Sequence, residues 1–158
     1  MHDFFLCLTY MLTLGLVFFL LGRVFPKHWL HPDRFPFRTY AWEETLWKAL
    51  QIRKWQAKVP DMSRLLPKLM PAKALTQKTA QDLPLMIEET CVAELTHGLL
   101  CLAGLFLLKL WPGPGGVILT ACYILLGNLP FLLIQRYNRP RLQRLLSRQR
   151  RRTNRKEA

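Results

Sequence analysis

Three polar side chains, Glu94, His97 and Asn128, lie inside two long apolar segments of the chain. Ionisable groups in a membrane-spanning helix are costly, so each one indicates a functional site. His97 could act as a general base, and Glu94, three residues earlier on a helix, could hold its tautomer and stabilise the imidazolium. Asn128 could orient a substrate or donate to a developing oxyanion. We therefore predict these three residues as catalytic.

A second set of polar residues lies near the ends of the same segments and predicts substrate binding. Arginine pairs with phosphate in bidentate fashion, so Arg136 and Arg139 are candidate phosphate ligands, with Glu88 and Glu89 as their partners. Arg53 falls within the apolar face of an earlier helix, where it could reach an anionic ligand or extend to lipid phosphates. The predicted substrate-binding residues are Arg53, Glu89, Gln135, Arg136, Asn138 and Arg139.

Three apolar blocks must position these residues, and they predict an all-α integral membrane protein with a single membrane domain over 1–158. The first block has no charged residue over 4–22, which is long enough to cross a ~30 Å hydrocarbon core at 1.5 Å per residue. It lacks the basic start and small-residue cleavage site of a signal peptide, so we expect it to stay uncleaved. The predicted spans cover about 4–24, 85–111 and 116–136.

The last two spans are separated by Pro-Gly-Pro-Gly-Gly at 112–116, which predicts a tight turn and an antiparallel hairpin. Residues whose numbers sum to about 225 should then lie at similar depth. This counting places His97 opposite Asn128 and Glu89 opposite Arg136. Asn128, Gln135 and Arg139 also share one helical face, so we expect the arginines to form a rim around the mouth of the same site.

Two basic segments flank the hairpin. The segment at about 25–83 is rich in Trp, with a predicted interfacial helix over 40–60 and short helices joined by turns over 61–83. The tail at about 138–152 predicts a basic amphipathic helix on the inner leaflet. By the positive-inside rule we expect a multi-pass protein of the cell membrane, with the N-terminus outside and the C-terminus in the cytoplasm.

The composition excludes several classes of function. The net charge is +13 although 51% of the residues are hydrophobic, and three long apolar blocks argue against a nucleic-acid-binding protein. The four cysteines form no C-x-x-C pair, so we expect no metal site and no resident cofactor. A general base within the bilayer, with phosphate-binding arginines at the mouth of the site, fits acyl transfer to a hydroxyl of a lipid acceptor. The acyl donor would be a CoA-type thioester, which acts as a co-substrate. Three helices enclose little volume, so a homo-oligomer is plausible.

Several short motifs resemble the glycosyl-4,4'-diaponeurosporenoate acyltransferase family. They are Ile-Arg-Lys-Trp at 52–55, Ile-Glu-x-Thr at 87–90, Ala-Glu-Leu-x-His at 93–97, Asn-x-Pro at 128–130 and Gln-Arg-Tyr-Asn-Arg-Pro-Arg-Leu at 135–142. The family comprises small membrane proteins of staphyloxanthin-type carotenoid synthesis. The resemblance implies transfer of a fatty acyl group to a sugar hydroxyl of a glycosylated carotenoid or another membrane glycolipid.

Two other interpretations remain open. The protein could be a non-enzymatic scaffold or a lipid-binding partner in a lipid-biosynthetic complex. The His-Asn-Glu cluster could also be a hydrogen-bonded lock for the hairpin without catalytic work. Substitution of His97 by Gln separates these alternatives, because a scaffold should tolerate it.

Overall fold

The computed structural model describes residues 1–59 and 83–157. Within these ranges the chain forms helices and no strand. Three helical stretches are long and apolar enough to cross a membrane, namely His2–Val24, Leu83–Leu110 and Pro114–Arg155. This confirms the predicted all-α architecture with three spans. The short helices predicted over 61–83 lie outside the described residues, except that Leu83 is described as the first residue of the second span.

The described chain divides into two compact units. Unit 1 comprises Met1–Pro26 and Val92–Leu133, and unit 2 comprises Lys27–Cys91 and Ile134–Ala158. Unit 1 contains α1 (His2–Val24), the second part of α5 (Leu83–Gly104), α6 (Leu107–Leu110), α7 (Pro114–Cys122) and a π-helical turn, η4 (Tyr123–Asn128). Unit 2 contains the segment after α1, the first turns of α5 and most of α8 (Leu129–Glu157).

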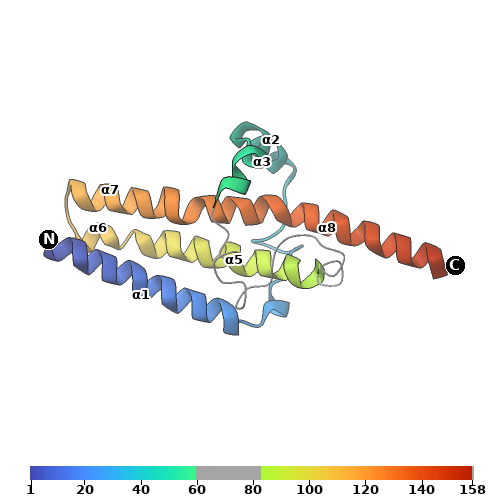
Figure 1. Cartoon of the computed structure of the whole chain (residues 1–158), viewed down its shortest axis with the longest axis horizontal. Helices are drawn as coiled ribbons and strands as arrows, with labels where there is room; N and C mark the ends of the chain where they lie inside the picture. The colour runs from blue at the N-terminus through green and yellow to red at the C-terminus, as the bar shows by residue number, and fades with distance from the viewer. Residues whose placement is uncertain (60–82, 158) are drawn as a thin grey trace. The chain divides into compact units, whose positions relative to one another are not determined.

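Helix α1 packs along the hairpin of unit 1 (Figure 1). The Tyr10 hydroxyl donates to the carbonyl of Ala103 at 3.0 Å, and the Phe4 ring meets Trp111 edge to face at 6.2 Å. Nine further large apolar side chains of α1 are exposed, as expected for a helix that faces lipid.

The predicted tight turn joins α6 to α7. Gly113 has φ +124°, a conformation that side-chain-bearing residues rarely adopt. Gly116 lies against the backbone carbonyl of Trp111, in a space too small for a Cβ atom. The Pro-Gly-Pro-Gly-Gly sequence therefore provides both the backbone conformation and the close approach that an antiparallel hairpin requires.

The amphipathic segment of unit 2 is divided into short helices. Instead of one helix over 40–60, the structure has α2 (Ala41–Leu50), α3 (Ile52–Trp55) and a 3₁₀ turn, η2 (Gln56–Lys58). The division falls at Gln51, which has left-handed backbone angles (φ 49°) and ends α2. Helix α2 buries Glu43 and Trp47 and leaves Trp42 and Leu50 exposed.

Helix α8 is continuous over 136–138, where the sequence predicted a boundary between the third span and a separate basic helix, and it also continues through Pro140. An internal proline removes one backbone hydrogen bond, so other contacts must hold the helix together at this residue. The side chains on either side of Pro140 are held within unit 2. Arg139 bonds to Thr90, and the guanidinium of Arg141 lies 4.3 Å from the Tyr137 ring centroid. These contacts favour a continuous helix over a turn.

Candidate functional site

His97 and Asn128 meet inside unit 1, as the hairpin counting predicted. The Nδ1 atom of His97 lies 3.1 Å from Oδ1 of Asn128. The Asn128 side chain is buried, whereas His97 is half-buried. A polar pair of this kind, one member reachable from outside, can position a reactive imidazole.

The second hydrogen bond of Asn128 fixes the tautomer of the histidine. Nδ2 of Asn128 donates to the backbone carbonyl of Tyr123 at 3.0 Å. The opposite amide orientation would place two oxygen acceptors against each other, so Oδ1 must face His97. Nδ1 of His97 is therefore the donor, and neutral His97 carries its lone pair on Nε2. Asn128 can therefore hold this tautomer of His97.

The π-helical turn η4 places the backbone carbonyl of Tyr123 where it accepts the hydrogen bond from Asn128. In a π turn the backbone bonds span five residues, and such turns are frequent at functional sites. The Tyr123 ring at its start lies against Gly104 of α5, where a Cβ atom would meet the ring at 2.7 Å. The small residue lets the two helices approach closely. The π turn and Gly104 together place the carboxamide on the side of α5.

Phe131 completes the surroundings of the imidazole. Its ring stacks on His97 with a centroid separation of 5.1 Å and an interplanar angle of 14°. This contact fixes the plane of the imidazole. Glu94 lies one helical turn before His97 and is 8% exposed. The site thus combines an oriented base with a buried carboxylate on the same helix.

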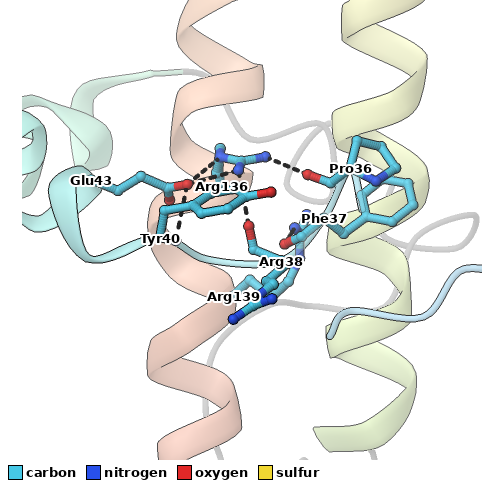
Figure 2. A network of polar contacts seen from close by, with 7 residues as sticks. All are labelled: Pro36, Phe37, Arg38, Tyr40, Glu43, Arg136 and Arg139. Carbon is cyan, nitrogen blue, oxygen red and sulfur yellow. Dashed lines mark hydrogen bonds and ion pairs between the residues drawn. The ribbon is translucent and has the colours of Figure 1, made fainter. Parts of the chain in front are cut away.

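Arg136 lies at the centre of a polar network in unit 2 (Figure 2). Its Nε and Nη2 atoms donate to Oε1 of Glu43 at 3.1 and 2.7 Å, and Nη1 and Nη2 donate to the carbonyls of Pro36 and Arg38. Glu43 also accepts from the backbone N–H of Tyr40 at 3.3 Å, as an acidic residue in the first turn of a helix often does. The network joins α2, α8 and the loop between α1 and α2.

Arg139 is completely buried in unit 2, with 0% of its surface exposed. Its Nε and Nη2 atoms donate to the hydroxyl and the carbonyl of Thr90, and Nη1 donates to the carbonyl of Phe37 at 2.8 Å. Its guanidinium also lies 5.3 Å from the Phe37 ring centroid. The expectation that Arg139 forms part of an exposed rim is therefore wrong, because its donors hold the backbone of unit 2 together.

Glu89 and Arg136, which the counting placed at similar depth, form their ion pairs with other residues. Glu89 accepts a hydrogen bond from Nζ of Lys27 at 2.9 Å, and the carboxylate partner of Arg136 is Glu43. Similar depth alone does not make Glu89 and Arg136 an ion pair. The segment that follows α1 provides Lys27 for Glu89, and α2 provides Glu43 for Arg136. Neither Lys27 nor Glu43 lies in the hairpin, so counting residues along its two helices could not find them.

Two cavities in unit 2 hold the other predicted substrate-binding residues. One, of about 510 Å³, is lined by Glu89, Gln135 and Asn138 together with Arg141, Arg144 and Arg148. The other, of about 710 Å³, is lined by the cations Lys48, Arg53, Lys54, Arg141 and Arg144. Tyr40, Trp47 and Tyr137 form its aromatic walls, and we call it the aromatic–cationic pocket.

The comparison with known proteins shows the family. The sequence model of the family described as glycosyl-4,4'-diaponeurosporenoate acyltransferase matches residues 26–148. The chain belongs to this family. It is therefore an acyltransferase. A protein of that name from Staphylococcus aureus (strain MRSA252) is 31% identical over 146 residues, covering 90% of this chain and 87% of the relative.

A second relative of the same name, from Staphylococcus haemolyticus (strain JCSC1435), is 32% identical over 111 residues. That match covers 68% of this chain and 63% of the relative. No solved structure matches the chain significantly.

For an acyltransferase, the two units offer different chemistry. The oriented imidazole of unit 1 can deprotonate a hydroxyl, and the cavities of unit 2 can bind anionic groups. Sequence reasoning missed Arg141, Arg144 and Arg148 as cavity residues. Their spacing of three and four residues, which places them on one face of a helix, was the available signal.

Proposed function

We propose that this acyltransferase moves a fatty acyl group from a CoA-type thioester to a sugar hydroxyl of a membrane glycolipid, with a glycosylated carotenoid as the first candidate acceptor. The names of its relatives support the acceptor class. The observation that carries the chemistry is the Tyr123–Asn128–His97 chain of hydrogen bonds, since it leaves the basic lone pair on Nε2 of the imidazole.

In the proposed mechanism, Nε2 of His97 accepts the proton of the sugar hydroxyl while the hydroxyl oxygen attacks the thioester carbonyl. A carbon–oxygen bond forms, and the carbonyl becomes a tetrahedral oxyanion. Its collapse breaks the carbon–sulfur bond, and the imidazolium returns the proton to the departing thiolate. The products are the ester and the free thiol, so atoms and charges balance without a metal or a redox step.

The residues around His97 have separate roles in this mechanism. Asn128 is a positioning residue that accepts from Nδ1 and keeps the productive tautomer. The buried carboxylate of Glu94 stabilises the imidazolium that forms during attack. Phe131 holds the ring plane by stacking on the imidazole.

We further propose that the reaction takes place at the cytoplasmic leaflet of the cell membrane. The segment after α1 and the second part of α8 carry most of the Lys and Arg residues, whereas the α6–α7 turn has only Lys109 nearby. The positive-inside rule then places the N-terminus outside and the C-terminus in the cytoplasm. A water-soluble thioester would reach the enzyme from that side.

The decisive experiment measures transfer from a radiolabelled acyl-CoA to a glycosylated carotenoid by the purified protein in lipid nanodiscs. The change is His97→Gln, which keeps an amide near Asn128 but removes the base. We expect the rate to fall about 10²- to 10⁴-fold, the usual contribution of a general base. His31→Gln is the matched control, because His31 is exposed in unit 2, and its rate should equal that of the wild type.

Undiminished transfer by His97→Gln would remove the imidazole from the mechanism. No transfer by the wild type from any acyl donor, together with normal lipid synthesis in cells that carry His97→Gln, would instead favour the scaffold interpretation. Lipid mass spectrometry of cells with and without the protein identifies the acceptor, because that glycolipid loses one acyl chain.

A further inference from the structure

The aromatic–cationic pocket carries more positive charge than its structural contacts require. Among the residues that the structure describes, five cations line it and one carboxylate, Glu44, faces them, which gives four net positive charges. Glu44 pairs with Lys48 at 3.5 Å, and both side chains are more than 70% exposed, so this pair offsets little of the charge. Like charges gathered around one cavity repel each other, and an anionic ligand relieves that repulsion.

The walls of the pocket suit a flat, delocalised ring. Trp47 meets Tyr137 edge to face with centroids 6.2 Å apart, and the guanidinium of Arg141 lies 4.3 Å from the Tyr137 ring centroid. Trp47 is almost completely buried, so this wall is held by the unit itself. A nucleobase can stack on such aromatic and guanidinium surfaces, whatever its identity.

The size and the neighbouring cavity fit the same class of ligand. A volume of about 710 Å³ lies within the ~300–1,000 Å³ range of small-molecule sites. The second cavity shares Arg141 and Arg144 with the pocket and adds the amide side chains of Gln135 and Asn138. A ligand whose phosphate lies in the first pocket could extend an amide-bearing chain into this second cavity and form hydrogen bonds with Gln135 and Asn138.

We propose that the aromatic–cationic pocket binds the 3'-phosphorylated adenosine diphosphate end of the CoA-type acyl donor. This inference rests on the proposed function, which supplies the donor. A phosphomonoester carries about two negative charges and the diphosphate adds two more, so about four charges match the four net positive charges of the pocket. In this proposal Arg53, which lines the pocket, contacts the anionic ligand rather than lipid phosphates.

The test uses the full chain in nanodiscs of phosphatidylcholine, with CoA binding measured by isothermal titration calorimetry. Arg53→Gln and Lys54→Gln each remove one exposed charge from the pocket. Each should weaken CoA binding about tenfold, the usual effect of losing one charge-assisted hydrogen bond. Dephospho-CoA should also bind the wild type about tenfold more weakly, because it lacks the 3'-phosphate. Arg151→Gln and Arg152→Gln, which alter exposed residues outside both cavities, should change the affinity less than twofold.

The possible outcomes separate this site from the proposed function. If the wild type binds CoA and the pocket variants bind it equally well, the pocket is not the nucleotide site, although the donor class stands. If the wild type neither binds CoA nor accepts acyl-CoA in the transfer assay, the donor class itself fails. If nanodiscs with phosphatidylglycerol abolish CoA binding and the pocket variants restore it, an anionic lipid headgroup occupies the pocket and the inference is overturned.

Discussion

Substitution of Glu43 by Gln tests whether the buried ion pair with Arg136 holds unit 2 together. The carboxylate is 0% exposed, and its Oε1 atom accepts two N–H donors of Arg136. Removing one member of a buried pair leaves the other charge uncompensated, which costs about 3–5 kcal/mol. The Arg136 side chain is 17% exposed and keeps its bonds to the carbonyls of Pro36 and Arg38, so we expect the lower end of this range, about 3 kcal/mol.

The measurement is thermal unfolding of the detergent-solubilised protein, followed by near-ultraviolet circular dichroism. A loss of about 3 kcal/mol should lower Tm by about 10 °C for a domain of this size. The matched control is Glu44→Gln, the same change at the next residue of α2. Glu44 is 71% exposed and pairs with the exposed Lys48, so its loss should cost about 0.5 kcal/mol or less.

A double variant distinguishes the ion pair from simple packing. Glu43→Gln combined with Arg136→Gln removes both charges, so its destabilisation should be smaller than the sum of the two single changes. Equal unfolding temperatures for Glu43→Gln and Glu44→Gln would refute the reasoning, and so would strict additivity in the double variant.

Two further predictions concern unit 1. Asn128→Leu removes the acceptor that orients His97, so kcat for acyl transfer should fall about 10²-fold or more while KM for the acceptor changes little; an unchanged kcat would contradict the tautomer argument. Gly116→Ala places a Cβ atom against the Trp111 carbonyl and should destabilise the hairpin by about 1–3 kcal/mol in the same thermal assay. Gly15→Ala is its control, because nothing lies within 4 Å of that position and a helical alanine is slightly favoured.

The contact between His97 and Asn128 could be predicted because a tight turn fixes the register of a hairpin. Once Pro112 and Gly113 are identified as the turn, counting outward along two helices of equal rise gives matched depths. The three spans were predictable for a similar reason, since long runs without charge have few alternatives to crossing a membrane.

The polar network of unit 2 could not be predicted in the same way. Glu43 and Arg136 are 93 residues apart, and Lys27 and Glu89 are 62 apart, with no turn that fixes their register. The burial of Arg139 was missed because its acceptors are the hydroxyl and backbone of Thr90 and the carbonyl of Phe37. Carbonyl acceptors leave no signature in the sequence. The π turn at Tyr123–Asn128 was missed as well, because its six residues would also suit an ordinary helix.

That π turn makes the orientation of Asn128 sensitive to chain length. Each residue of an α-helix advances the side chains by about 100° around its axis, and a π turn absorbs one additional residue without breaking the helix. Deleting a single residue such as Leu126 would let the turn relax to ordinary α-helical geometry and remove the five-residue spacing by which the Asn128 carboxamide reaches the Tyr123 carbonyl. A change of chain length in this one turn would therefore alter the support of the imidazole while the rest of the helix keeps its geometry.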